Sequence, residues 1–272
     1  MNLDEKIISA LKDLDYKEAT EIQKKAIPIA LKKRDILAAA QSGTGKTAAF
    51  LLPILTELIA NKQPNKPVLR TLILVPTREL ASQISKAAED LGKYLDVQKL
   101  AVFGGVSTKE QEKKIAKGLD ILVATSGRLM EHLKNGTVDL SSVTTVVIDE
   151  VDTMLDMGFL EDIEKILPSV GPKRQIMMFS ATMNQNVKKL AKEFLTDPVV
   201  IEVAQQRSAV KIIDQQIVLV DEANKAAALS YIIGSKNYSQ VLVFVNMKIE
   251  ADKLVENLEL DGLPAACIHG DV

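Results

Sequence analysis

The sequence is poor in the residues that build cross-links and metal centres. It has one Cys, two His and no Trp among 272 residues. One Cys excludes an internal disulfide framework, and so few Cys and His residues predict no zinc site, so a bound metal is expected on carboxylates. The scarcity of Cys also favours a reducing, cytoplasmic compartment.

Long apolar runs and an excess of positive charge are missing too. No stretch approaches the roughly 18 apolar residues of a membrane span, and residues 1–9 lack the basic and then apolar pattern of a targeting signal. Lys and Arg number 34 against 36 Asp and Glu, a net charge of −2. These features argue against a membrane partner and against nucleic-acid binding through bulk positive charge, while local contacts stay open.

What the sequence does contain is an alternation of short apolar runs with helical periods. Runs rich in Val, Ile and Leu, separated by amphipathic segments such as residues 79–94 and 184–195, predict a parallel sheet covered by helices on both faces. The fold class is therefore α/β. Strands are expected at residues 36–40, 71–75, 99–103, 121–124, 145–148, 176–179 and 199–203.

The alternation breaks near residue 204. Residues 205–212 have no clear period, so we predict a linker between a first domain, residues 1–204, and the opening part of a second α/β domain, residues 213–272. In the second domain strands are expected at 216–220, 241–245 and 265–268, with helices near 224–233 and 249–260. Such a layer is small for a self-supporting parallel sheet, so we expect it to be incomplete.

A phosphate-binding loop follows the first predicted strand. It reads Gln41-Ser42-Gly43-Thr44-Gly45-Lys46-Thr47 and runs into an apolar helix. Glycines let backbone N–H groups curl around phosphate oxygens, Lys46 would reach the β and γ phosphates, and the Thr47 hydroxyl would coordinate Mg²⁺. The loop therefore predicts a site for the phosphates of a nucleotide with Mg²⁺, and the resemblance described below implies that the nucleotide is ATP.

Two adjacent carboxylates end the strand at residues 145–148. Asp149 and Glu150 are expected at the carboxyl end of the sheet, where open α/β folds bind ligands. Asp149 can hold Mg²⁺ through water, and Glu150 can orient and polarise a water for in-line attack on the γ-phosphate. A plain acidic turn is the alternative, which the phosphate-binding loop makes the weaker one.

An ordered set of motifs carries a family resemblance. It comprises AQSGTGKT, PTRELA at residues 76–81, GG at 104–105, DEVD at 149–152 and SAT at 180–182. The chain resembles the DEAD-box RNA helicases, and VVIDEVDTMLDMGF, MMFSATM and QVLVFVNMK are most similar to the bacterial RhlE-type subgroup. The resemblance implies a RecA-like first domain and ATP-dependent local unwinding of RNA duplexes.

The resemblance implies that Gln23 reads the adenine edge and that Tyr16 stacks on the base. Gln23 also stands three residues after Thr20, the spacing of a capping box, so it could instead close a helix N-terminus. Asp15 and Ala19 replace the family's usual Gly and Pro.

Further residues match positions that in the family grip the RNA sugar-phosphate backbone. They are Pro76, Thr77, Arg78, Gly105, Thr125, Gly127 and Arg128. Contacts of this kind suit RNA of any sequence. Ser126 departs from the family's Pro, which puts the rigidity of this loop in doubt. By resemblance, Ser180 and Thr182 hydrogen-bond Asp152 and couple the nucleotide state to domain closure.

Other expectations concern the remaining chemistry. His132 is expected on a helix surface, and Cys267 is expected to be a buried small side chain rather than a reactive thiol. The sequence stops at Val272, before the Gln-x-x-Arg and HRxGRxGR motifs of the family, so slow hydrolysis is expected of these residues alone.

The alternative function is a non-catalytic, nucleotide-gated RNA-binding or scaffold protein. An ATPase acting on DNA or protein is disfavoured because PTRELA and SAT accompany DEVD.

Overall fold

The computed structural model describes residues 3–41, 43–61, 67–203 and 214–270. The chain divides into two compact units, Met1–Gln206 and Arg207–Val272. The predicted linker, residues 205–212, lies outside the described residues. The exact domain boundaries therefore stay a prediction.

The first unit is built on a parallel sheet of seven strands in the order β3-β4-β2-β5-β6-β1-β7. Every strand predicted for the first domain is confirmed to within one residue at each end. The strands are β1 (Ile36–Ala39), β2 (Thr71–Val75), β3 (Lys99–Val102), β4 (Ile121–Thr125), β5 (Thr145–Ile148), β6 (Gln175–Ser180) and β7 (Val199–Glu202). The α/β fold class is thereby confirmed for this unit.

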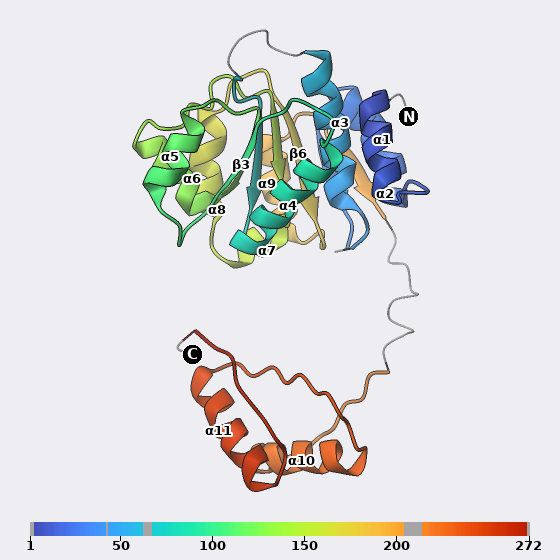
Figure 1. Ribbon diagram of the computed structural model, residues 1–272, viewed down its shortest axis with the longest axis vertical. Helices are drawn as coiled ribbons and strands as arrows, with labels where there is room; N and C mark the ends of the chain where they lie inside the picture. The colour runs from blue at the N-terminus through green and yellow to red at the C-terminus, as the bar shows by residue number, and fades with distance from the viewer. Residues whose placement is uncertain (1–2, 42, 62–66, 204–213, 271–272) are drawn as a thin grey trace. The chain divides into compact units, whose positions relative to one another are not determined.

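Helices cover both faces of the sheet and enclose two separate cores (Figure 1). One face carries α1 (Glu5–Asp13), α2 (Glu21–Leu31), α3 (Lys46–Ala60) and α4 (Arg78–Leu91). The other carries α6 (Ser126–Lys134), α7 (Val151–Asp156), α8 (Leu160–Ile166), the short η1 (Leu167–Ser169) and α9 (Gln185–Phe194), and α5 (Thr108–Ile115) packs against it through Ile115. Alternate strand residues point to opposite faces, so Ile73 and Leu74 of β2 enter different cores.

The carboxyl ends of the strands meet along one edge, the carboxyl edge. Ala39 pairs with Ser180 across β1 and β6, and Val75 pairs with Thr125 across β2 and β4. The backbone N–H of Asp149, just after β5, donates to the carbonyl oxygen of Leu74 at 3.0 Å. Close register in a parallel sheet therefore gathers the loops that leave six of the strands.

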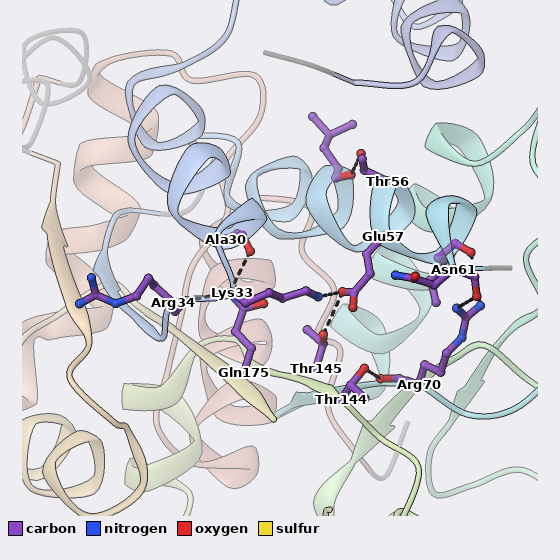
Figure 2. Close-up of polar contacts among 12 residues, drawn as sticks. Ala30, Lys33, Arg34, Thr56, Glu57, Asn61, Arg70, Thr144, Thr145 and Gln175 are labelled. Carbon is purple, nitrogen blue, oxygen red and sulfur yellow. Dashed lines mark hydrogen bonds and ion pairs between the residues drawn. The ribbon is translucent and has the colours of Figure 1, made fainter. Parts of the chain in front are cut away.

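The opposite edge of the sheet is held by polar contacts (Figure 2). The side-chain amide of Gln175, the first residue of β6, donates to the carbonyl oxygens of Ala30 at 3.1 Å and Arg34 at 2.7 Å. Arg70 donates to the carbonyl oxygen of Asn61 at 2.7 Å, just after α3. These bonds pin the ends of α2 and α3 to the amino ends of the strands, far along the strands from the carboxyl edge.

The second unit contains η2 (Glu222–Asn224), α10 (Lys225–Ser235) and α11 (Lys248–Leu260), which confirms both predicted helices. The three predicted strands are wrong for this structure, because residues 214–270 contain no assigned strand. Leu219 is 92% exposed and Phe244 86% exposed. An apolar run becomes a strand only when a neighbour supplies its backbone hydrogen bonds, and these runs have none among the described residues.

Candidate functional site

The strand order divides the carboxyl edge into two halves. The loops after β5, β6 and β1 hold the predicted nucleotide residues, and we call this part the nucleotide half. The loops after β3, β4 and β2 hold the predicted RNA residues and form the RNA half. The two halves meet where β2 pairs with β5.

The phosphate-binding loop has the backbone that the sequence predicts. Gly43 and Gly45 have φ of +79° and +91°, a region that favours glycine. Helix α3 begins directly after Gly45, and no described side chain caps its N-terminus. Its first N–H groups are therefore available to an anion. The Thr44 hydroxyl donates to the carbonyl oxygen of Gln41 at 2.7 Å, and Ser42 lies outside the described residues.

Lys46 and Asp149 are buried side by side, but no hydrogen bond joins them. The Lys46 side chain is 7% exposed, and its Nζ has no hydrogen-bond partner among the described residues. Its nearest carboxylate oxygen, Oδ1 of Asp149, is 4.0 Å away, beyond hydrogen-bond reach. Burial raises the pKa of Asp149 to about 6, although Lys46 acts in the opposite direction. A buried ammonium without a partner is a group that an anionic ligand would satisfy.

Glu150 has a strained backbone. Its φ of +52° and ψ of +50° are left-handed, which is uncommon for any residue other than glycine. Its N–H donates to Oδ1 of Asp149 at 2.9 Å. This bond fixes the Asp149 carboxylate against the backbone of Glu150, and helix α7 starts immediately afterwards. Thr47 is half-buried in the first turn of α3.

Thr182 holds Asp152, as the resemblance implies, and the Ser180 hydroxyl supports Thr182 instead of donating to Asp152. Its Oδ2 accepts from the backbone N–H of Thr182 at 2.9 Å and from the Thr182 hydroxyl at 3.0 Å. The Ser180 hydroxyl donates to the carbonyl oxygen of Thr182 at 2.7 Å. Burial acts to raise the pKa of Asp152, but hydrogen bonds led by those from Thr182 hold it below its usual value. The other oxygen, Oδ1, is buried without a partner among the described residues.

Gln23 joins helix α2 to the phosphate-binding loop. Its Oε1 accepts from the backbone N–H of Thr20 at 3.0 Å, and its Nε2 donates to the carbonyl oxygen of Gly45 at 3.2 Å. The capping alternative is thereby confirmed, and adenine recognition stays a prediction. Tyr16, the predicted stacking residue, is 45% exposed.

In the RNA half, the segments after β2 and β3 touch each other. Pro76 is buried, and the Thr77 hydroxyl oxygen accepts from the N–H of Leu80 at 3.2 Å, which caps α4. Gly105 has φ of +80°, and a Cβ placed there would lie 2.5 Å from Nη1 of Arg78. The guanidinium of Arg78 therefore covers the glycine that the sequence assigns to the same surface.

Helix α6 starts directly after β4, so no flexible loop separates Thr125 from Gly127. Ser126, which replaces the family's Pro, is the first helical residue; its hydroxyl is buried without a partner among the described residues. Gly127 is exposed. The side chain of Arg128 is 11% exposed and donates to the carbonyl oxygen of Val106 at 2.9 Å.

Sequence reasoning missed two residues of this half, Gln111 and His132. The prediction that His132 lies on a helix surface is wrong, because it is fully buried and its Nε2 lies 2.9 Å from Oε1 of Gln111. Gln111 is 5% exposed. The available signal was positional, because His132 follows Arg128 by four residues and so shares its helix face.

Cys267 also differs from its prediction. It is half-buried, and its ligand atom lies with those of Asp252 and His269 inside 4.8 Å, although the sequence predicted no metal site with Cys or His. The thiol lies 3.3 Å from Oδ1 of Asp252 and His269 Nε2 lies 2.9 Å from the same oxygen. The bond to Asp252 raises the pKa of the Cys267 thiol, which opposes the thiolate form that binds metals.

None of the helices in the described parts of the chain has the length and hydropathy needed to cross a bilayer.

The comparisons with known proteins agree with this geometry. The chain is 38% identical over 272 residues to the DEAD-box ATP-dependent RNA helicase RhpA of Helicobacter pylori, covering all of this chain and 54% of that protein. It is 36% identical over 271 residues to CshA of Bacillus subtilis, again covering 54% of the relative. It is 38% identical over 277 residues to RhlB of Pseudomonas aeruginosa and covers 70% of it. The chain thus spans about half the length of the first two relatives.

A solved structure gives the same result. A DEAD box protein from the hyperthermophile Methanococcus jannaschii superposes with a TM-score of 0.71 at 34% identity, covering all of this chain and 72% of that one. The RhlE-type placement is not confirmed by the relatives named above. The profile of the DEAD/DEAH box helicase family matches residues 20–190, so this chain belongs to the DEAD/DEAH box helicase family.

Proposed function

We propose that the chain binds Mg-ATP on the nucleotide half of the carboxyl edge and the backbone of RNA on the RNA half, as part of an ATP-dependent RNA helicase. The buried Lys46 ammonium, which has no hydrogen-bond partner in the described part of the chain, carries the nucleotide proposal. The uncapped N-terminus of α3 supports it. The helix end and the Lys46 ammonium lie together, and each would be stabilised by a bound anion such as phosphate.

The donor set fits Mg²⁺. Asp149 is a buried carboxylate whose raised pKa reflects missing solvation, and a hydroxyl of Thr47 stands in the first turn of α3. Oxygen ligands of this kind, supplemented by water and phosphate, suit Mg²⁺. When bound, the ion would neutralise charge on the β and γ phosphates.

The chain's own residues divide the work of hydrolysis. Lys46 would bind the terminal phosphates, and Glu150 would orient the attacking water and accept its proton. The bond from the Glu150 N–H to Asp149 orients the Asp149 carboxylate beside the backbone of Glu150. The bond between Asp152 and Thr182 would couple the presence or absence of the γ-phosphate to the position of the segment after β6.

The RNA half supports backbone binding without sequence readout. Its predicted contacts come from exposed Arg78, from Gly105 and Gly127, and from the start of α6, which no described side chain caps. Helix N-termini and glycine backbones bind phosphates rather than bases. RNA as the partner and a cytoplasmic location belong to this proposal, which the family membership supports.

Calorimetry with Mg-ADP tests the nucleotide proposal. We expect Lys46→Ala to abolish measurable binding, because the ammonium is the main positive charge facing the phosphates. Lys24→Ala is the matched control, since Lys24 is an exposed lysine paired with Glu21, and it should bind as the wild type does. Equal affinity in wild type and Lys46→Ala would refute the site.

The non-catalytic alternative is decided by turnover. Wild-type protein that includes the family's later motifs should hydrolyse ATP faster when RNA is added, and Glu150→Gln in that protein should remove the hydrolysis while keeping ATP binding. Hydrolysis absent from both proteins would favour a nucleotide-gated scaffold. Single-stranded DNA that competes equally with RNA would favour the DNA-directed ATPase.

A further inference from the structure

A buried polar network lies behind the RNA half and ends on the backbone of one loop. The loop, residues 103–106, connects β3 to α5 and contains Gly105; we call it the glycine loop. At one end, the side-chain Nε2 of Gln111 donates to the carbonyl oxygen of Phe103 at 3.1 Å. At the other, Nη1 of Arg128 donates to the carbonyl oxygen of Val106 at 2.9 Å. Both ends of the glycine loop are therefore tied to side chains of α5 and α6.

Gln111 connects these two anchors. Its Oε1 accepts from Nη1 of Arg128 at 3.1 Å, and the same oxygen lies 2.9 Å from Nε2 of His132. Arg128 can only donate and the Phe103 carbonyl can only accept, so the orientation of the Gln111 amide is fixed by its partners. His132 must then carry its proton on Nε2 and donate to Gln111. The other ring nitrogen, Nδ1, is buried with no partner among the described residues.

A second arm of the network reaches the start of α5. Nε of Arg128 lies 3.0 Å from Oε2 of Glu131, and the Thr108 hydroxyl donates to Oε1 of Glu131 at 3.1 Å. Arg128 thus has three partners and a side chain that is only 11% exposed. A guanidinium with three protein partners is better placed to hold the glycine loop and α5 in position than to move toward a ligand.

We propose that Gln111 and His132 are positioning residues which hold Arg128 and the glycine loop in the conformation that binds the RNA backbone. The inference rests on the proposed function of the RNA half. It names two residues that touch no RNA but set where Gly105 and Arg78 stand, because Arg78 covers Gly105. A fully buried His whose Nδ1 has no partner within the described ranges costs desolvation energy that packing alone would not require, so we assign it this role.

The test measures the affinity of the full 272-residue chain for a fluorescent single-stranded oligouridine. His132→Leu keeps a side chain of similar size but removes the donor to Gln111. We expect it to weaken RNA binding about fivefold. His132→Gln places an amide nitrogen near the former Nε2, so it should restore most of the affinity. Gln111→Leu removes the anchor at Phe103 and the oxygen that accepts from Arg128, and it should weaken binding about tenfold or more.

Two controls separate positioning from general stability. Leu140→Ala creates a cavity in the core on the same face of the sheet, so it should lower the melting temperature without changing RNA affinity. Each variant should bind Mg-ADP as the wild type does, since the nucleotide half is untouched. His132→Leu combined with Arg128→Ala should bind RNA no more weakly than Arg128→Ala alone, because both act through one network.

The outcomes separate the positioning role of Gln111 and His132 from the proposed binding of RNA by the RNA half. If Arg78→Ala and Arg128→Ala weaken RNA binding while His132→Leu and Gln111→Leu do not, the RNA half stands and the positioning role is refuted. If neither arginine variant changes RNA affinity, the RNA half itself is refuted, and the inference with it. Equal losses in Leu140→Ala and His132→Leu would show that only stability was changed.

Discussion

The two halves of the carboxyl edge differ in how their polar groups are paired. Among the described residues of the nucleotide half, the buried atoms without a partner belong to charged side chains, Nζ of Lys46 and Oδ1 of Asp152. In the RNA half they belong to neutral ones, the Ser126 hydroxyl and Nδ1 of His132, while Arg128 has three partners. The nucleotide half therefore has charged groups that a ligand could pair with. In the RNA half, hydrogen bonds within the protein already hold Arg128 in place.

The largest effect is expected in the phosphate-binding loop. Gly45→Ala would place a Cβ 2.5 Å from Nε2 of the buried Gln23 at a φ of +91°, so strain and clash add. We expect a loss of about 2 to 4 kcal/mol in unfolding free energy, measured by urea denaturation, and loss of Mg-ADP binding. Gly43→Ala is the matched control, because its φ is +79° but no described atom beyond its chain neighbours lies within 4 Å of the new Cβ. It should lose only about 1 to 2 kcal/mol. Equal losses would show that contact with Gln23 is unimportant.

The next effect is the pH dependence of stability. Because the pKa of Asp149 is about 6 in the folded state and near 3.8 when unfolded, the unfolded chain releases this proton first as pH rises. The contribution of Asp149 is thus fully present below about pH 4 and is lost as pH rises through 6. Relative to wild type, Asp149→Asn should gain about 1 to 3 kcal/mol in unfolding free energy between these limits. A difference that stays constant from pH 4 to 7 would contradict the raised pKa.

A smaller effect is expected at Gln23. Gln23→Ala removes the bond to the Thr20 N–H and should lower the unfolding free energy by about 0.5 to 2 kcal/mol, as the loss of a helix cap does. Adenine recognition predicts more, namely weaker binding of Mg-ADP with unchanged weak binding of Mg-GDP. Calorimetry that finds equal losses for the two nucleotides would leave Gln23 with the capping role alone.

The smallest effect concerns the RNA half. Arg78→Ala should weaken binding of single-stranded RNA by about threefold to tenfold, and by the same factor for every sequence, since a phosphate contact carries no base information. The slope of log affinity against log salt concentration should become shallower by the amount expected for one lost phosphate contact. Oligonucleotides of different sequence that separate by more than about tenfold in the wild type would contradict readout of the backbone.

Much of the fold could be predicted because its signals are local. The five inner strands β1, β2, β4, β5 and β6 are short apolar runs buried almost throughout, and the edge strands β3 and β7 are only partly buried. The second unit shows where this reasoning ends. Residues 241–245 read as a strand, yet Phe244 is 86% exposed, since pairing depends on a neighbour that no local pattern specifies.

The site follows the same rule. Positions fixed by motif spacing, such as Asp152 and Thr182, come together as expected. Spacing places His132 on the same helix face as Arg128, but its contact with Gln111 could not be predicted, because these two residues are 21 positions apart and meet only in the fold. The capping bond of Gln23 was available from spacing, whereas its second bond, to Gly45, crosses 22 residues and required the fold.

The backbone bond between Asp149 and Leu74 joins the two halves at their boundary. The amide proton of Asp149 lies in the nucleotide half, and its acceptor belongs to the strand that leads into Pro76 and Arg78. The exchange rate of this proton with deuterium therefore reports on both ligands from one position. Addition of Mg-ADP and addition of RNA should each slow it, so a single resonance can follow how occupation of one half changes the other.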